Sequence, residues 1–262
     1  MSVGQAKAIT ASDISVTAAA ALTSIAVTPA PATVPDNGGA VLASAELRAI
    51  WWGPTAAFPV DERRTVEAEL AALDGSSYLG VAGQYLRGAA AHLTFHASTS
   101  WTDTSASPTG TVTADAVATE VAAYLTATGQ TPSTHVVYVV LSATMAGDLC
   151  AFHTSRAVTA NGSTALVPVV FLPNTTGVAK CDTHLGRAGL SEGTRSVVSS
   201  AAHELLETMT DPIPGATWSA GDEQEIADRC NSDIRLVPLS GGLTLPIQAI
   251  WSNAAGACTI GE

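Results

Sequence analysis

Two apolar runs rich in β-branched residues decide the fold class: His135-Val-Val-Tyr-Val-Val-Leu141 and Ala165-Leu-Val-Pro-Val-Val-Phe-Leu172. Runs of this kind, with no polar alternation, are typical of strands that are covered on both faces of a sheet. Further segments carry helical or strand patterns, and they alternate with these runs along the chain: 41–52, 61–73, 77–86, 91–98, 113–128, 194–210 and a hairpin over 234–252. The order predicts an α+β fold, with a mixed central sheet flanked by helices.

The first 40 residues differ in composition from the rest of the chain. They are rich in Ala, Thr, Ser and Pro, and they end in prolines and glycines that interrupt regular structure. We therefore expect a leader or linker over 1–40 and one globular domain over 41–262. The stretch Ile14–Val27 is a poor match to a signal peptide, because Ser and Thr interrupt it and Asp13 precedes it.

Composition excludes two classes of partner. The chain has 262 residues, with 11 basic against 23 acidic side chains and a net charge of -12, so a surface that follows nucleic-acid phosphates is excluded. No apolar run reaches the roughly 18 residues of a membrane-spanning helix. With 47% hydrophobic and 13% charged residues, the chain is expected to bury a core rather than to be disordered.

The four cysteines are Cys150, Cys181, Cys230 and Cys258, and no two of them form a Cys-x-x-Cys pair. An even number at wide spacing predicts two disulfides and an exported, extracellular protein, with three pairings open. The alternative is four buried free thiols in a cytosolic protein.

One segment carries most of the chemical information: Ala202-His-Glu-Leu-Leu-Glu-Thr-Met-Thr-Asp-Pro212. On a helix, His203 and Glu207 project side by side and can share one divalent cation, as the histidines of the zincin His-Glu-x-x-His helix do. Glu204 is rotated from His203 by about 100°, the position of the general base in zincins. The sequence thus predicts a zincin-like active helix; the alternative is a solvated helix face.

A third ligand is expected downstream, because acids concentrate over 204–233 against a single base. Glu225 can be that ligand, while Asp228 accepts from the other ring nitrogen of His203, or the two acids exchange roles. Zn²⁺ is the expected ion, although a carboxylate-rich set also admits Ca²⁺ or Mn²⁺. The alternative for this segment is an exposed acidic loop.

Other candidates carry weaker signals. His92 and His96 share a strand face, and His153 can approach the site if a disulfide at Cys150 folds its loop inward. Five tryptophans offer a carbohydrate-stacking platform, although core packing is the default for those in strand-like runs. No nucleophilic-serine elbow, phosphate loop or dinucleotide fingerprint is present.

Several of these motifs occur together in one order: Gly38-Gly-Ala-Val-Leu42, Ile50-Trp-Trp-Gly53, Tyr78-Leu79, Gln84-Tyr85, Tyr138-Val-Val-Leu-Ser142, Cys150-Ala-Phe-His153, Ala202-His-Glu-Leu-Leu-Glu207, Asp211-Pro212, Glu225-Ile-Ala-Asp228 with Cys230, and Gln248-Ala-Ile-Trp-Ser252 before Cys258. In this order the chain resembles the phosphate-induced protein family, also called EXORDIUM-like, over about 38–262. The resemblance implies an exported, cysteine-bearing protein, and plant members are associated with cell walls and brassinosteroid-linked growth.

The chain departs from that family at several points. The cysteine-rich middle stretch of plant members is reduced here to Cys150 and Cys181, and plant relatives have Asn where Asp211 stands, so Asp211 is not counted as a ligand. Sequence proximity pairs Cys150 with Cys181 and Cys230 with Cys258.

Two hypotheses of function follow. In the first, the protein is an exported zinc hydrolase, most simply a peptidase, in which His203, Glu207 and Glu225 or Asp228 hold the metal and Glu204 is the catalytic base. In the second, it is a non-catalytic extracellular or cell-wall-associated binding protein, and the same residues hold a structural ion. The expected partner is a peptide or protein substrate under the first hypothesis and a cell-wall component under the second. A helix that is merely packed and salt-bridged, without metal, is the third alternative.

Overall fold

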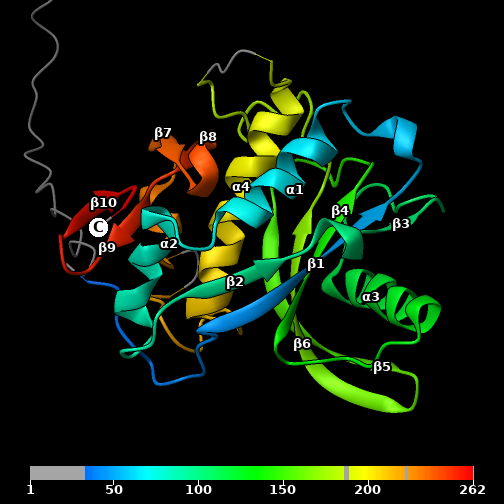
Figure 1. Cartoon of the computed structure of the whole chain (residues 1–262), viewed down its shortest axis with the longest axis horizontal. Coiled ribbons are helices and arrows are strands. Elements are labelled where there is room, and N and C mark those ends of the chain that lie inside the picture. The colour runs from blue at the N-terminus through cyan, green and yellow to red at the C-terminus, as the bar shows by residue number, and fades with distance from the viewer. Residues whose placement is uncertain (1–32, 186–188, 222–223, 262) are drawn as a thin grey trace, which may run out of the picture. The chain divides into compact units, whose positions relative to one another are not determined.

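A six-stranded, largely parallel sheet carries the fold (Figure 1). The computed structural model describes residues 33–185, 189–221 and 224–261. The strand order is β2-β1-β4-β6-β5, and β3 also pairs with β1; only β5 is antiparallel to its neighbour. The strands of this sheet are β1 Ser44–Trp52, β2 His92–Phe95, β3 Trp101–Asp103, β4 Val136–Ser142, β5 Phe152–Ala160 and β6 Ser163–Leu172. This mixed sheet confirms the predicted α+β class.

Helices cover both faces of the sheet. They are α1 Glu62–Ala72, α2 Ser77–Gly80, α3 Ala114–Thr128 and α4 Glu192–Thr210. On one face, Leu47, Ala49 and Trp51 pack with α1, α2 and α4, whereas on the other face Ile50 packs with α3 (Figure 1). The sheet is therefore the middle of three layers.

Short strands complete the layer that contains α4. They are β7 Ile234–Pro238, β8 Thr244–Gln248, β9 Ile250–Ser252 and β10 Ala257–Thr259. Strands β7 and β8 form the predicted hairpin, whose turn is at Ser240–Gly242, and β9 pairs with β10. The β7–β8 hairpin packs against α4, so the C-terminal part of the chain supports the helix that carries the expected metal ligands.

Helix α4 begins and ends at polar residues. The Ser191 side chain accepts a hydrogen bond from the Thr194 N–H, which caps the first turn. Val198, Ala202, Leu205 and Met209 recur at helical spacing and are fully buried. The chain leaves the helix at Asp211, whose carboxylate accepts the backbone N–H groups of Gly215, Ala216 and Thr217. Asp211 thus builds the turn after the helix rather than facing the expected ligands.

The structure differs from the sequence prediction in several places, and two of its strands, β3 and β10, lie outside every expected segment. The helix expected over 77–86 is a single α turn followed by a 3-10 helix, Val81–Tyr85. The sequence assigns no element between the runs at 135–141 and 165–172, whereas the structure forms the edge strand β5 there, which returns to β6 through Asn161 and Gly162. Both turn residues have positive φ, 49° and 78°, as a two-residue hairpin turn requires.

The last part of the expected linker packs on the domain. Val34 is buried, and the Asn37 N–H donates to the Thr217 carbonyl at 2.7 Å. Residues 33–40 therefore lie along the turn that follows α4, whereas 1–32 fall outside the described residues.

Helix α1 buries two carboxyl groups. Glu62 is 2% exposed and Glu69 0% exposed, and within the described chain neither oxygen of Glu69 nor Oε2 of Glu62 has a hydrogen-bond partner. Burial, with the charge of Asp61 adding to it, raises the pKa of Glu62 to about 8. Burial also raises the pKa of Glu69 well above its usual value.

These groups predict a loss of stability with rising pH. Glu62 binds its proton more tightly in the folded chain (pKa about 8) than in the unfolded chain (about 4.3), so its burial destabilises the fold increasingly as pH rises through this window. Glu62→Gln mimics the protonated form, and we expect it to raise the free energy of unfolding by roughly 2–4 kcal/mol near pH 8 but little near pH 4. Urea unfolding at both pH values measures this, with Glu67→Gln on the same helix as control. An equal effect at both pH values would contradict the assignment.

Candidate metal centre

Helix α4 presents the first three groups of the centre. The Nε2 atom of His203 lies 3.0 Å from Oε2 of Glu207, so the two side chains are neighbours, as their four-residue spacing predicts. The side chains of His203, Glu204 and Glu207 are 13%, 10% and 3% exposed. This part of the helix therefore does not form the solvated face of the alternative interpretation.

The downstream acidic segment does reach this helix. Oε1 of Glu207 accepts the backbone N–H groups of Ala227 at 3.0 Å and of Asp228 at 3.1 Å. Oδ1 of Asp228 lies 3.5 Å from Nε2 of His203, the same nitrogen that faces Glu207, rather than from the other ring nitrogen. The other oxygen of Asp228 accepts the Glu225 N–H at 3.2 Å, which closes the turn.

Strand β5 adds a second imidazole. Nδ1 of His153 lies 3.1 Å from Oε2 of Glu204 and 3.7 Å from Oε2 of Glu207. Its Nε2 lies 3.1 Å from the backbone oxygen of Asp211 and 3.4 Å from Oε2 of Glu225. The sequence places His153 only among the weaker candidates, whereas the structure places it between the helix and the acidic segment. The one sequence signal for it is Cys150, three positions earlier.

The ligand-type atoms form two compact groups. One group is His153, Glu207 and Glu225, and the other is His203, Glu204 and Glu207; within each group the atoms lie within 4.8 Å of one another. Glu207 belongs to both. The trio expected from the sequence, His203, Glu207 and Glu225, is distributed over the two groups.

Excess negative charge dominates the electrostatics of the centre. Burial lowers the pKa of His153, but the hydrogen bond and charge of Glu204, together with Glu207 and Glu225, raise it to about 9. Burial also lowers the pKa of His203, but the charges of Glu207 and Glu204 outweigh it and raise this pKa well above its usual value. Burial, reinforced by the charge of Glu207, raises the pKa of Glu225 to about 9. The arrangement therefore stabilises added positive charge, whether protons or cations.

A cleft of about 820 Å³ opens above these groups. Its walls come from the start of β5, the 179–184 segment, α4 and the 225–234 segment, and the Cys150–Cys181 disulfide lies in one wall. None of the tryptophans, all of which lie in the described part of the chain, lines this cleft. Trp51 is buried, and Trp218 Nε1 donates to the Tyr85 carbonyl at 2.6 Å. A tryptophan platform for carbohydrate stacking is therefore not part of this cleft.

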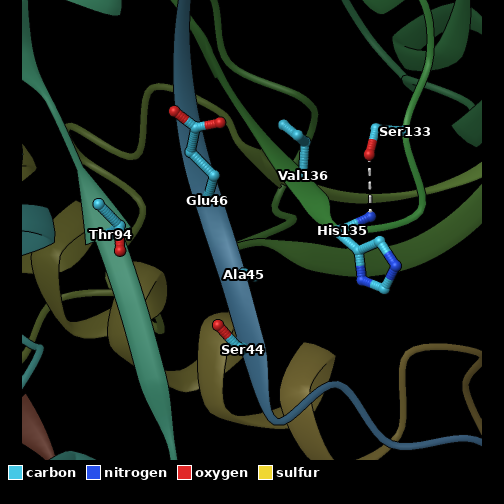
Figure 2. Close-up of a pocket in the computed structure, with 7 residues that line it drawn as sticks. All are labelled: Ser44, Ala45, Glu46, Thr94, Ser133, His135 and Val136. Carbon is cyan, nitrogen blue, oxygen red and sulfur yellow. Dashed lines mark hydrogen bonds between the residues drawn. The ribbon is translucent and has the colours of Figure 1, made fainter.

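The other histidines lie apart from the centre. His92 is exposed and faces Asp74 at 3.5 Å, and within the described chain neither His92 nor His96 belongs to a compact metal-binding group. His135 lines a shallow hollow at the start of β1 and β4, where its N–H donates to the Ser133 hydroxyl (Figure 2). In this view the His135 imidazole and the Glu46 carboxylate point in different directions, and Glu46 pairs with Arg48.

Two disulfides hold the non-helical parts of the centre. They pair Cys150 with Cys181 and Cys230 with Cys258, which confirms the pairing by sequence proximity. The first begins three residues before His153, and the second begins two residues after Asp228. In the described residues, no helix is both long enough and apolar enough to cross a membrane.

Comparison with protein-family models, with curated proteins and with solved structures finds no match to this chain.

Proposed function

We propose that the protein is a divalent-metal-dependent hydrolase, with its cation in the His–Glu centre at the floor of the cleft and peptide bonds as its substrate. One observation carries the proposal: imidazoles and carboxylates from β5, α4 and the 225–228 segment converge, largely buried, where a cleft opens to solvent. Buried charges of one sign are costly unless they are paired or bind a metal.

The residues present fit such an ion. Imidazole nitrogen and carboxylate oxygen are ordinary Zn²⁺ ligands. His203 and Glu207 would hold the ion, with a third ligand from Asp228, which faces the same imidazole nitrogen, or from Glu225, which groups with Glu207 and His153. Oε2 of Glu225 is buried and has no hydrogen-bond partner among the described residues, so a cation would satisfy it. The high share of carboxylates keeps Ca²⁺ and Mn²⁺ as alternative ions.

The protein groups around the ion support hydrolysis. When bound, Zn²⁺ supplies Lewis acidity and lowers the pKa of water. If the centre holds a single ion, Glu204 would accept a proton from the attacking water. His153 would position the Glu204 carboxylate through the 3.1 Å contact between its Nδ1 and Oε2 of Glu204. The cleft has no tryptophan platform for sugars, and its polar walls, including the exposed side chains of Asn231 and Ser232, offer hydrogen bonds to a polypeptide backbone.

We also propose that the protein is exported from the cell. Two disulfides favour an oxidising compartment and hence export. Membership of the EXORDIUM-like family and a cell-wall partner remain predictions from the sequence resemblance.

A specific contact favours a second candidate, a binding protein with a structural ion. Glu207 ties α4 to the 225–228 segment through two backbone hydrogen bonds, so an ion beside it would cross-link three parts of the chain. In that case metal removal lowers the melting temperature, and no peptide is cleaved.

Metal analysis and a cleavage assay test the proposal. The purified protein is expected to hold a stoichiometric divalent metal and to cleave a mixed peptide library. A chelator should stop cleavage, and Zn²⁺ should restore it. Glu204→Gln should reduce the rate by about 10²–10⁴-fold, whereas Glu192→Gln, in the first turn of the same helix, should leave it unchanged. Stoichiometric metal without cleavage would favour the structural ion, and absence of metal would overturn both candidates.

A further inference from the structure

The two compact ligand groups share one carboxylate. We propose that the centre holds two divalent cations bridged by Glu207, one against His153 and Glu225 and the other against His203 and Glu204. This inference rests on the proposed function only in requiring that the cluster is a metal centre.

The position of Glu207 supports a bridge. Its Oε2 atom lies 3.0 Å from Nε2 of His203 and 3.7 Å from Nδ1 of His153, so the carboxylate stands between the two imidazoles. Each group then has the same composition, one imidazole and two carboxylates, within 4.8 Å. Paired metal ions about 3.5–4 Å apart are a common arrangement in hydrolytic enzymes. Oε1 of Glu207 is occupied by two backbone N–H groups, so the bridge would use Oε2, the oxygen that faces both imidazoles.

Charge supports a second ion independently of this spacing. The centre gathers four carboxylates, Glu204, Glu207, Glu225 and Asp228, with two imidazoles. With neutral imidazoles, one divalent ion leaves two of the four negative charges unbalanced, and two ions balance them all. Protein cations do not take this role: of the described residues that line the cleft, the only Lys or Arg is Lys180, which is exposed and pairs with Asp148 at 2.9 Å.

Glu225 provides a further sign of a missing partner. Glu225 is 6% exposed, and its Oε2 atom accepts no hydrogen bond from the described chain, although Nε2 of His153 lies 3.4 Å away. The ion proposed between His153 and Glu225 would coordinate this oxygen. His153 thereby becomes a metal ligand rather than only a neighbour of Glu204.

The two-ion arrangement changes the role of Glu204. In the one-ion form Glu204 accepts a proton, so Glu204→Gln should keep all of the metal. With two ions, Glu204 is a ligand of the His203 ion, so the same variant should lose one of two equivalents. Metal content separates these roles without any measurement of activity.

Metal titration of the full chain tests the inference. Metal-free protein titrated with Mn²⁺ is expected to bind two equivalents, measured by calorimetry and by elemental analysis after gel filtration. The electron paramagnetic resonance spectrum should show spin coupling between two Mn²⁺ ions. His153→Ala and His203→Ala should each retain one equivalent and lose the coupling, whereas His135→Ala, outside the centre, should retain two.

The outcomes separate this inference from the proposed function. One equivalent in the wild-type protein, an uncoupled spectrum at saturation, or two equivalents in Glu204→Gln would overturn the second ion and leave the one-ion hydrolase standing. No bound metal would overturn both. The wild-type stoichiometry and spectrum decide the question even if a histidine variant fails to fold.

Discussion

Glu207→Ala is expected to remove all bound metal and to lower the free energy of unfolding by about 2–4 kcal/mol even in metal-free protein. The loss of metal follows because Glu207 belongs to both ligand groups. The loss of stability follows because its Oε1 atom accepts the N–H groups of Ala227 and Asp228, which then remain buried without a partner. Urea unfolding of metal-free and metal-loaded protein measures the two effects separately.

Glu207→Gln separates these two roles further. Its remaining amide oxygen can still accept both N–H groups, so the metal-free variant should unfold close to the wild type, although its metal affinity is lost. Glu192 lies on the same helix and accepts a hydrogen bond from the Gly177 N–H. A Gln oxygen can retain this bond, so Glu192→Gln serves as the matched control. If Glu207→Ala kept its metal, Glu207 would not be a ligand.

Removing either disulfide is expected to lower the free energy of unfolding by about 3–4 kcal/mol, the loop-closure effect for cysteines that are 31 and 28 positions apart. It should also weaken metal binding, because each disulfide holds one non-helical part of the centre. Loss of Cys230–Cys258 frees the segment that carries Glu225 and Asp228, whereas loss of Cys150–Cys181 frees the segment before His153.

Paired Cys→Ser variants, each compared with the wild type, test this by urea unfolding and by Mn²⁺ titration. Measuring Mn²⁺ affinity without urea, where each variant is fully folded, separates the positioning of the ligands from the stability of the whole fold. A variant that is less stable but binds Mn²⁺ with unchanged affinity would show that the disulfide supports the fold without positioning the ligands.

Much of the fold follows from local patterns in the sequence. The apolar runs at 135–141 and 165–172 identify the central strands β4 and β6, and the helical pattern over 194–210 places helix α4 within two residues of its observed start. Strand β5 has no such pattern, since it lies at the sheet edge and alternates between buried and exposed residues over only part of its length. The turn at Asn161-Gly162 just before an apolar run was the available signal for this hairpin.

The candidate centre divides in the same way. Helical periodicity is sufficient to place His203 beside Glu207, because both lie on one element. The position of His153 depends instead on strand order: β5 must return antiparallel to β6 before the imidazole can meet Glu204, 51 positions along the chain. The 51-residue spacing between His153 and Glu204 does not by itself predict their contact.

The double hydrogen bond at Glu207 has a consequence for which residue can occupy this position. A carboxylate can anchor two peptide groups with one oxygen and still offer the other oxygen to an ion. A neutral imidazole has a single acceptor nitrogen, so a histidine here could ligate the ion or receive the peptide groups, but not both. The local architecture thus selects Glu over the second His of a His-Glu-x-x-His helix, and a search restricted to that zincin signature would overlook chains built in this way.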